Sequence, residues 1–358
     1  MVDAGEYSNM PSTPTEVLTP IEFTGTAKEY FGIWITNILL SIITIGIYSA
    51  WAKVRTKKYF AHHTLIAESS FDYHAKPLSI LKGRIIALVL YFIYGLVSQA
   101  SPLLGFILLV LVFLATPWII VQSMRFNLRN TSHRGLRFNF VGKISEAVKI
   151  YIFYTLLIIF TLGLILPFLN YRSRNFAINN TCFGLSRFHA QLTIRSFYLT
   201  YLKLAGWIFL TALGFAALLV FVNKSGLAAR FCFDVANFIP YLPLIFLTFL
   251  IVGPGAYLKA SLGRLVYNST QLENFSFVCN WRARDLIWIY GSNFILIVLS
   301  FGLLIPWSKI RSTNYLVNHM AIKGDANFDH FVAGKIEQLS ATGQEIGEFF
   351  DVDLPVLG

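Results

Sequence analysis

Three polar side chains stand at equivalent places inside apolar stretches of this 358-residue chain. Asn37, Tyr154 and Asn293 each precede a glycine by nine residues. A polar group surrounded by hydrocarbon needs a hydrogen-bonding partner, which is either another helix or a polar ligand. Two interpretations therefore stay open: these residues line a polar cavity for a solute, or they bond neighbouring helices together.

Basic side chains follow the same glycines at a fixed distance. Arg55, Arg172 and Arg311 each lie nine residues after their glycine. Further basic residues close to them are Lys53, Arg174 and Lys309. Guanidinium groups bind phosphate in a bidentate fork, and basic pockets at the cytoplasmic membrane face suit anionic lipid head groups. The six residues are candidate contacts for an anionic lipid or another anion; the alternative is that they only fix the membrane orientation.

The sequence offers no constellation for catalysis. It has no G-x-S-x-G motif, no P-loop and no H-E-x-x-H pattern, and its cysteines, Cys182, Cys232 and Cys279, form no C-x-x-C pair. The 18 carboxylates lie in the terminal regions or between the apolar runs, so none is placed for a proton relay inside a bilayer. We expect a protein that is not an enzyme and has no metal or cofactor.

The composition favours a membrane protein. Apolar residues make up 56% of the chain, charged residues 13%, and the mean hydropathy is +0.61. Seven apolar runs approach the roughly 20 residues that a bilayer core requires. They are residues 30–52, 85–101, 103–122, 150–171, 204–222, 239–258 and 286–308. The sequence therefore predicts an α-helical polytopic membrane protein whose helices and helix ends carry the polar and basic residues.

One stretch recurs along the chain. The sequence TIGIYSAWAKVRTKKYFAHHT, at residues 44–64, matches residues 161–181 at an offset of 117 and residues 300–320 at an offset of 256. Matches at fixed offsets indicate internal repeats. The predicted organisation is a disordered N-terminal tail (1–21), one membrane domain (22–336) with three repeats (about 22–122, 138–258 and 275–336), and an acidic C-terminal tail (337–358).

Each copy contains residues that interrupt a helix. The candidate hinges or helix breaks are Gly46, Gly163, Pro167, Gly302 and Pro306. Proline lacks a backbone N–H and clashes with the preceding helical turn, so an apolar segment that meets glycine and then proline bends or stops there.

Aromatic couplets at alternate positions follow the basic stretches. They are Phe71 with Tyr73, Phe138 with Phe140, Phe275 with Phe277 and, more loosely, Phe188 and Phe328. Alternation with a period of two, next to glycine, asparagine or serine, indicates short strands joined by turns. We expect small interfacial or cytoplasmic β-hairpin elements.

The distribution of basic residues leaves two main topologies open, and also a mixed one with a single re-entrant segment. If all seven runs cross the membrane, the repeats are inverted relative to one another, as in many secondary transporters. If the first, fourth and seventh runs instead dip in and return as hairpins broken at Gly46, Gly163 and Gly302, nearly all basic residues lie on the cytoplasmic side. The second arrangement agrees better with the positive-inside rule.

Three stretches also carry a family resemblance. The segments GIYSAWAKVR and ILKGR, together with the closing ATGQEIGEFFDVDL, resemble the YjgN family of bacterial inner-membrane proteins, a family catalogued as a domain of unknown function. The resemblance extends from about Glu22 to the end of the chain. It implies a multi-pass protein of the inner (cytoplasmic) membrane and implies no reaction.

Two functions from different classes follow. The first is a transporter or channel for an uncharged or anionic solute, with Asn37, Tyr154 and Asn293 along its path. The alternative is a lipid-binding or membrane-organising protein with a cytoplasmic cationic surface. The expected partners are the lipid bilayer and anionic phospholipids; the dispersed charge of +11 does not favour nucleic acid.

Overall fold

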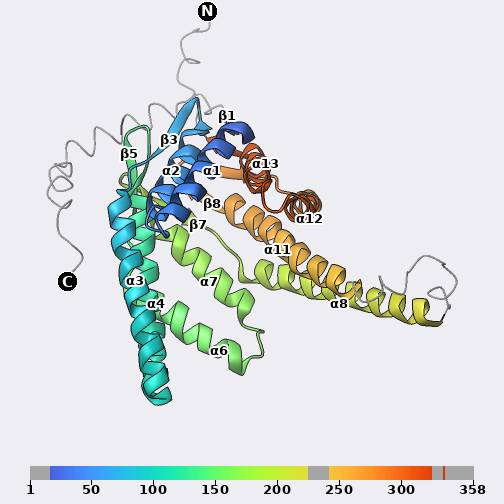
Figure 1. Cartoon of the computed structure of the whole chain (residues 1–358). Helices are drawn as coiled ribbons and strands as arrows, with labels where there is room; N and C mark the ends of the chain where they lie inside the picture. Colours follow the sequence, from blue (N-terminus) through green and yellow to red (C-terminus); the bar gives the residue numbers. More distant parts are fainter. Residues whose placement is uncertain (1–16, 225–241, 325–333, 335–358) are drawn as a thin grey trace, which may run out of the picture.

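The computed structural model describes residues 17–224, 242–324 and 334, and its helices fan out from a small ring of strands (Figure 1). In the described ranges the ring contains ten antiparallel strands: β1 (Val17–Phe23), β2 (Thr64–Ile66), β3 (Ser69–Tyr73), β4 (Thr131–His133), β5 (Leu136–Phe140), β6 (Thr181–Phe183), β7 (Ser186–Ala190), β8 (Thr270–Leu272), β9 (Phe275–Cys279) and β10 (Met320–Gly324). Strands that follow one another in the sequence are neighbours, and the ring closes between β1 and β10.

β1 closes the ring because it pairs with two strands. Val17–Pro20 pair with β10, and Ile21–Phe23 pair with β2. The Phe23 N–H also donates to Asn318 Oδ1 at 2.9 Å. A closed ring has no unpaired edge strand, so segments from the two ends of the described chain hold each other in place.

The prediction of a helical polytopic protein with internal repeats and small hairpin elements is wrong. The couplets of β3, β5 and β9 do lie in strands, but the hairpins join into one closed barrel, in which β3 pairs with β4, β5 with β6 and β7 with β8. Phe71, for example, lies opposite His133. Local periodicity indicates strands but not such distant pairings, because these depend on the helices that bring the hairpins together.

Packed side chains fill the ring. Ile21 of β1 and Phe275 of β9 belong to one buried cluster, and Leu136 of β5 and Leu272 of β8 belong to another, although neither pair is on adjacent strands. The phenyl rings at the third position of four alternate strands form a chain with centroid distances of 6.1–6.4 Å: Phe71, Phe138, Phe188 and Phe277. The ring is therefore a hydrophobic core and not an open pore.

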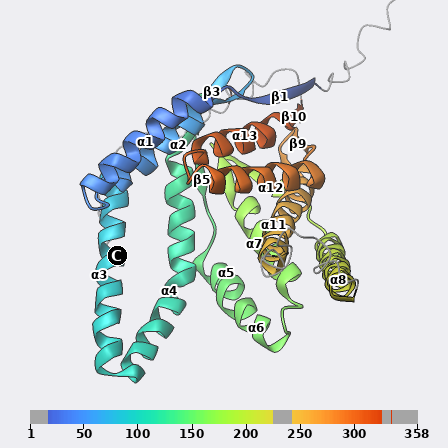
Figure 2. The same ribbon diagram turned by 45° about the vertical axis from the view of Figure 1, so that its right-hand side comes forward.

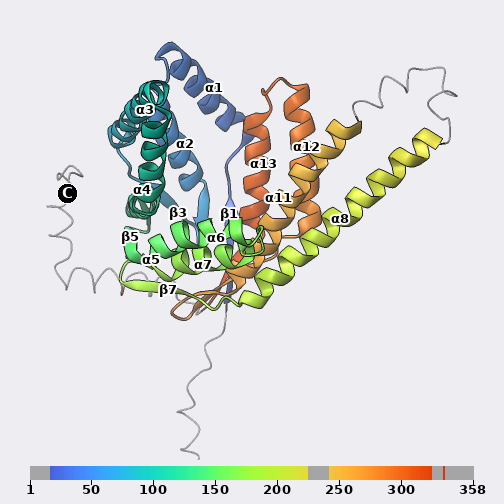
Figure 3. The ribbon, with the colours of Figure 1, turned by 90° about the horizontal axis from the view of Figure 1, so that it is seen from below.

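Five pairs of helical segments leave the ring in the described ranges. Each pair connects two strands that follow one another in the sequence: β1 and β2, β3 and β4, β5 and β6, β7 and β8, or β9 and β10. Their elements are α1 (Ala27–Ile43) and α2 (Ser49–His62); α3 (Pro77–Ala100) and α4 (Pro102–Arg129); α5 (Ile144–Val148), the π-helical turn η1 (Lys149–Phe153), α6 (Tyr154–Phe160) and α7 (Leu166–Asn179); α8 (Ile194–Lys224) and α11 (Leu242–Asn268); and α12 (Ala283–Leu299) and α13 (Ile305–Asn318). Figures 2 and 3 show these pairs extending from the strands in different directions.

A backbone hydrogen bond joins the two ends of each pair at the ring. The five bonds have N···O distances of 2.8–3.0 Å and run from Thr24 to His63, His74 to Asn130, Val141 to Asn180, Gln191 to Ser269 and Asn280 to His319. Each pair of helices thus starts and finishes at the same strand layer.

Within the described residues, three helices are long and apolar enough to cross a membrane. They are α3, α4 and α8 as far as Ala217. Of the other predicted runs, 30–52, 150–171 and 286–308 are each divided by a turn between two helices, and 239–258 begins outside the described residues. Hydropathy alone could not show these divisions, because the turns are themselves apolar.

The expected tails fall mostly outside the described residues. β1 begins at Val17, inside the predicted N-terminal tail 1–21, and is held by its two neighbouring strands. Residues 337–358, Cys232, Arg230 and Phe328 lie outside the described ranges.

Candidate functional site

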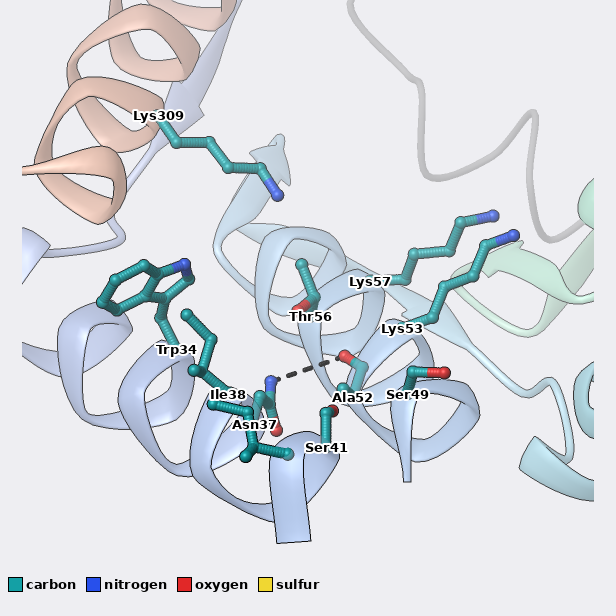
Figure 4. Close-up of a pocket in the computed structure, with 11 residues that line it drawn as sticks. Trp34, Asn37, Ile38, Ser41, Ser49, Ala52, Lys53, Thr56, Lys57 and Lys309 are labelled. Carbon is teal, nitrogen blue, oxygen red and sulfur yellow. Dashed lines mark hydrogen bonds between the residues drawn. The ribbon is translucent and has the colours of Figure 1, made fainter. Parts of the chain in front are cut away.

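A groove of about 670 Å³ runs between α1 and α2, and a lysine of α13 reaches its rim (Figure 4). Trp34, Ile38 and Ile42 line it from α1 at intervals of four residues, which places them on one helix face. The polar and charged lining residues are Asn37, Ser41, Ser49, Lys53, Thr56, Lys57 and Lys309. The groove therefore combines an apolar stripe with the side chains of three lysines, two of which, Lys53 and Lys57, extend away from Trp34 and Ile38 (Figure 4).

The three lysines come from two helical hairpins, as we call a pair of helices joined by a turn: α1 with α2, and α12 with α13. Lys53 and Lys57 are four residues apart on α2 and extend side by side, whereas Lys309 approaches from α13 (Figure 4). Lys309 Nζ donates to the Tyr30 hydroxyl at 3.1 Å and lies 4.7 Å from the centre of the Phe60 ring. These contacts hold one cation at a defined position by hydrogen bonding and cation–π attraction.

Lys57 is partly withdrawn from water. Its Nζ donates to the Tyr73 hydroxyl at 3.3 Å and to Asn127 Oδ1. Burial lowers the pKa of Lys57, and the positive charge of Lys53 lowers it further. An anion bound beside these two ammonium groups would relieve their mutual repulsion.

The two asparagines make different bonds at equivalent places. Asn293 is 5% exposed; its Nδ2 donates to Ser308 O at 3.2 Å and to Ser312 Oγ at 3.1 Å, and its Oδ1 accepts from Arg311 at 3.0 Å. Asn37 is 6% exposed and donates to Ala52 O at 3.5 Å, while its buried Oδ1 has no partner among the described residues. Each asparagine thus bonds to the second helix of its own hairpin.

Tyr154 lies in a third place. Its ring packs at 5.0 Å, edge to face, against Phe168 of α7, and it lines a pocket of about 360 Å³ with Arg172, Glu146 and Lys149. The structure therefore does not bring Asn37, Tyr154 and Asn293 together around one cavity: they belong to three different hairpins.

The three aligned arginines also lie on separate hairpins. Arg55 is exposed on α2, Arg172 lies 5.6 Å from the Phe168 ring on α7, and Arg311 on α13 donates to Ser292 Oγ at 2.7 Å as well as to Asn293. Arg174 is exposed on α7. Of the six candidate anion contacts, the structure brings Lys53 and Lys309 together in the groove.

The candidate hinges occupy the turns between helices. Gly46, Gly163 and Gly302 have φ values of 87°, 87° and 88°, in the left-handed region that glycine adopts without strain. Pro167 and Pro306 are buried in the first turns of α7 and α13. A proline at the start of a helix interrupts no hydrogen bond, so these prolines begin a helix and do not kink one.

Within the described ranges, no group of three or more histidine, cysteine or carboxylate side chains could hold a metal ion. Cys182 and Cys279 are buried in strands, and burial is the main reason that the pKa of the Cys279 thiol is raised. A buried thiol with a raised pKa is a poor nucleophile at neutral pH.

Sequence reasoning missed Lys57, Trp34 and Thr56 as groove residues. The available signal was helical spacing, since Lys57 lies one turn after Lys53 and Thr56 three residues after it. The approach of Lys309 had no such signal, because it depends on the packing of α13 beside α1.

Nearly the whole chain matches a known family. The family described as "Bacterial protein of unknown function (DUF898)" matches residues 18–349. The protein named inner membrane protein YjgN in Salmonella typhimurium is 26% identical over 349 residues, 85% of this chain and 88% of that protein. The protein of that name in Escherichia coli K12 is 32% identical over 119 residues, 33% of this chain and 30% of that protein.

No solved structure matches the chain. The relatives named inner membrane proteins, with the three apolar helices, place it in the bacterial inner membrane. The predicted resemblance to YjgN is confirmed, and the chain belongs to the DUF898 family.

Proposed function

We propose that this inner-membrane protein binds anionic phospholipid in the groove between α1 and α2 and so organises lipid around its hairpins. The observation that carries the proposal is that one groove is lined both by an apolar helix face and by three lysine side chains, those of Lys53, Lys57 and Lys309. An acyl chain would lie on Trp34, Ile38 and Ile42, while the phosphate would meet the ammonium groups. Basic pockets between helices at the cytoplasmic membrane face suit such head groups.

A transporter or channel, the first function expected from the sequence, has less support. The interior of the strand ring is filled by apolar side chains, and the candidate path residues bond within separate hairpins. The proposal therefore assigns no solute path, and it includes no catalytic step and no nucleic-acid partner. Multi-pass insertion of the hairpin formed by α3 and α4 is part of it.

Lys53→Gln with Lys309→Gln tests the groove. Each lysine near an anionic surface contributes about 1 kcal/mol, so the double variant should bind phosphatidylglycerol roughly 30-fold more weakly. The measurement is the retention of phosphatidylglycerol by the purified full-length protein, titrated in mixed micelles with phosphatidylcholine and quantified by native mass spectrometry.

The matched control is Arg55→Gln with Arg172→Gln. It removes the same charge from exposed positions outside the groove, so we expect wild-type retention. Equal weakening in both double variants would show that net charge, and not the groove, attracts the lipid, and would refute the proposal.

A further inference from the structure

Three helix pairs end in the same unusual turn. Between α1 and α2, α6 and α7, and α12 and α13, a non-glycine residue with positive φ precedes the glycine: Ile45 (49°), Leu162 (49°) and Phe301 (51°). Bulky apolar side chains seldom adopt this left-handed conformation, and a β-branched isoleucine is a clear outlier. Strain that recurs at three equivalent turns points to a role for the side chain itself.

These side chains are exposed to an extent that water would disfavour. Ile45, Leu162 and Phe301 are 94%, 93% and 97% exposed. Exposed apolar residues flank them on both sides: Ile42, Ile43 and Ile47; Ile159, Phe160 and Leu164; Leu299 and Leu303. The tips of the three hairpins therefore carry apolar residues and no charged ones between Ile42 and Tyr48, Ile159 and Ile165, or Val298 and Leu304.

The backbone of each turn satisfies its own N–H donors. In the first turn, the N–H of Gly46 bonds to Ser41 O at 2.7 Å, that of Ile45 to Ile42 O at 3.1 Å, and that of Tyr48 to Thr44 Oγ1 at 2.9 Å. In the third turn, Gly302 bonds to Ile297 O at 2.8 Å and Leu304 to Ser300 Oγ at 3.1 Å.

The middle turn uses the same backbone bonds. The N–H of Gly163 donates to Ile158 O at 2.9 Å, and that of Leu164 donates to Thr161 O at 3.0 Å. Irregular backbone is excluded from hydrocarbon because its polar groups lack partners there. Turns that bond their own donors to this extent largely escape that penalty.

The strand ring holds both ends of each of these three helical hairpins, so the second helix returns to the strands from which the first helix left. The bonds from Thr24 to His63, Val141 to Asn180 and Asn280 to His319 tie the two ends of each hairpin together at the strands. α1 and α12 have 17 residues, and α2, α7 and α13 have 14. At 1.5 Å per residue such helices measure about 21–26 Å, less than the roughly 30 Å of a bilayer core.

We propose that the tips at Ile45, Leu162 and Phe301 insert into the hydrocarbon of the inner membrane as re-entrant wedges that do not cross it, while the strand ring lies at the cytoplasmic face. The returning helices carry the basic residues Lys53, Arg55, Arg172, Arg174, Lys309 and Arg311, which the positive-inside rule keeps on that face. The partner of the three tips is thus the acyl-chain region of the lipid. This inference does not depend on lipid binding in the groove.

Depth-dependent fluorescence quenching tests the inference. Single cysteines replace Ile45, Leu162 or Phe301 in the full-length protein after removal of Cys182, Cys232 and Cys279, and each carries the environment-sensitive fluorophore NBD. In phosphatidylethanolamine–phosphatidylglycerol vesicles, we expect lipids with a nitroxide on the acyl chain to quench the fluorescence at least several-fold more than aqueous iodide does. A cysteine in place of Arg187, exposed in β7, should show the reverse.

Quenching of the three tips by iodide would overturn the proposal, as would their reaction with a membrane-impermeant maleimide from the periplasmic side. Labelling of the Arg187 site from the periplasmic side would overturn the cytoplasmic placement of the ring. Cysteines at Ile47, Leu164 and Leu303, which are exposed but lack the positive φ, give the same readout if a cysteine at a strained position prevents folding.

Discussion

Asn37 and Asn293 stand at equivalent sequence positions, yet the structure predicts opposite effects of replacing them with leucine. Asn293→Leu removes two neutral hydrogen bonds, worth about 1 kcal/mol each, and one bond from the Arg311 guanidinium, worth about 2 kcal/mol. Apolar burial of the leucine offsets about 1–2 kcal/mol of this. The expected net destabilisation is about 2–3 kcal/mol.

Asn37→Leu removes a single bond at the 3.5 Å limit and also a buried oxygen that has no partner among the described residues. A buried unsatisfied polar group costs about 1–3 kcal/mol, so we expect stabilisation of about 1–2 kcal/mol. In a chain of this size 1 kcal/mol shifts Tm by about 2 °C. Tm should therefore fall by about 5 °C for Asn293→Leu and rise by about 3 °C for Asn37→Leu.

The assay is thermal unfolding of the purified protein in a non-ionic detergent, followed by near-ultraviolet circular dichroism with no added lipid. An equal fall in Tm for the two variants would refute the reasoning, because it would mean that Asn37 has a polar partner that the structure does not contain. A small change for Asn293→Leu would show that its bonds do not hold α12 against α13.

Two further predictions concern the ring and its packing. Burial and, to a smaller extent, the charge of Arg134 lower the pKa of His133 to about 4 from its ordinary 6.5. As the pH falls, the unfolded chain therefore takes up a proton at this histidine before the folded chain does. The stability that depends on neutral His133 is complete above about pH 6.5 and is lost as the pH falls towards 4. Tm measured from pH 7.5 to 4.5 should decline less in His133→Gln than in the parent, and parallel curves would contradict this. Gly263→Ala should destabilise by about 1–3 kcal/mol in chemical denaturation, because its Cβ would lie 2.2 Å from the Trp281 ring. Gly255→Ala, on the same helix with no other atom within 4 Å of the new Cβ, is the control, and equal effects would show that the contact with Trp281 is not responsible.

Several features were predictable because they depend on neighbours in the sequence. The alternating Phe71 and Tyr73, or Phe275 and Phe277, identify strands, since side chains two apart share a face. The runs 85–101 and 103–122 lie in helices long and apolar enough to span a membrane. The place of Lys53 after Gly46 predicts an anion contact, and the family resemblance predicts the inner-membrane location.

The candidate polar path could not be judged in the same way. Equal spacing from a glycine places Asn37 and Asn293 at equivalent points of two hairpins, but the partners of each amide depend on the facing helix. There Ser312 and Arg311 approach Asn293 closely, whereas the hydrogen bond of Asn37 within the described part of the chain goes to the Ala52 carbonyl.

The amino-acid sequence by itself determined the short-range properties: which segments are apolar, where turns containing Gly46, Gly163 and Gly302 interrupt them, and where strands alternate. Only the tertiary structure decided that the strands close into one ring, that Lys309 joins Lys53 and Lys57 in a groove, and that each hairpin returns to its starting side. The physical reason is that ring closure pairs β1 with β10 across almost the entire described chain. Such contacts form only when the packing of all the intervening units brings the two strands together, and no local pattern of residues records that.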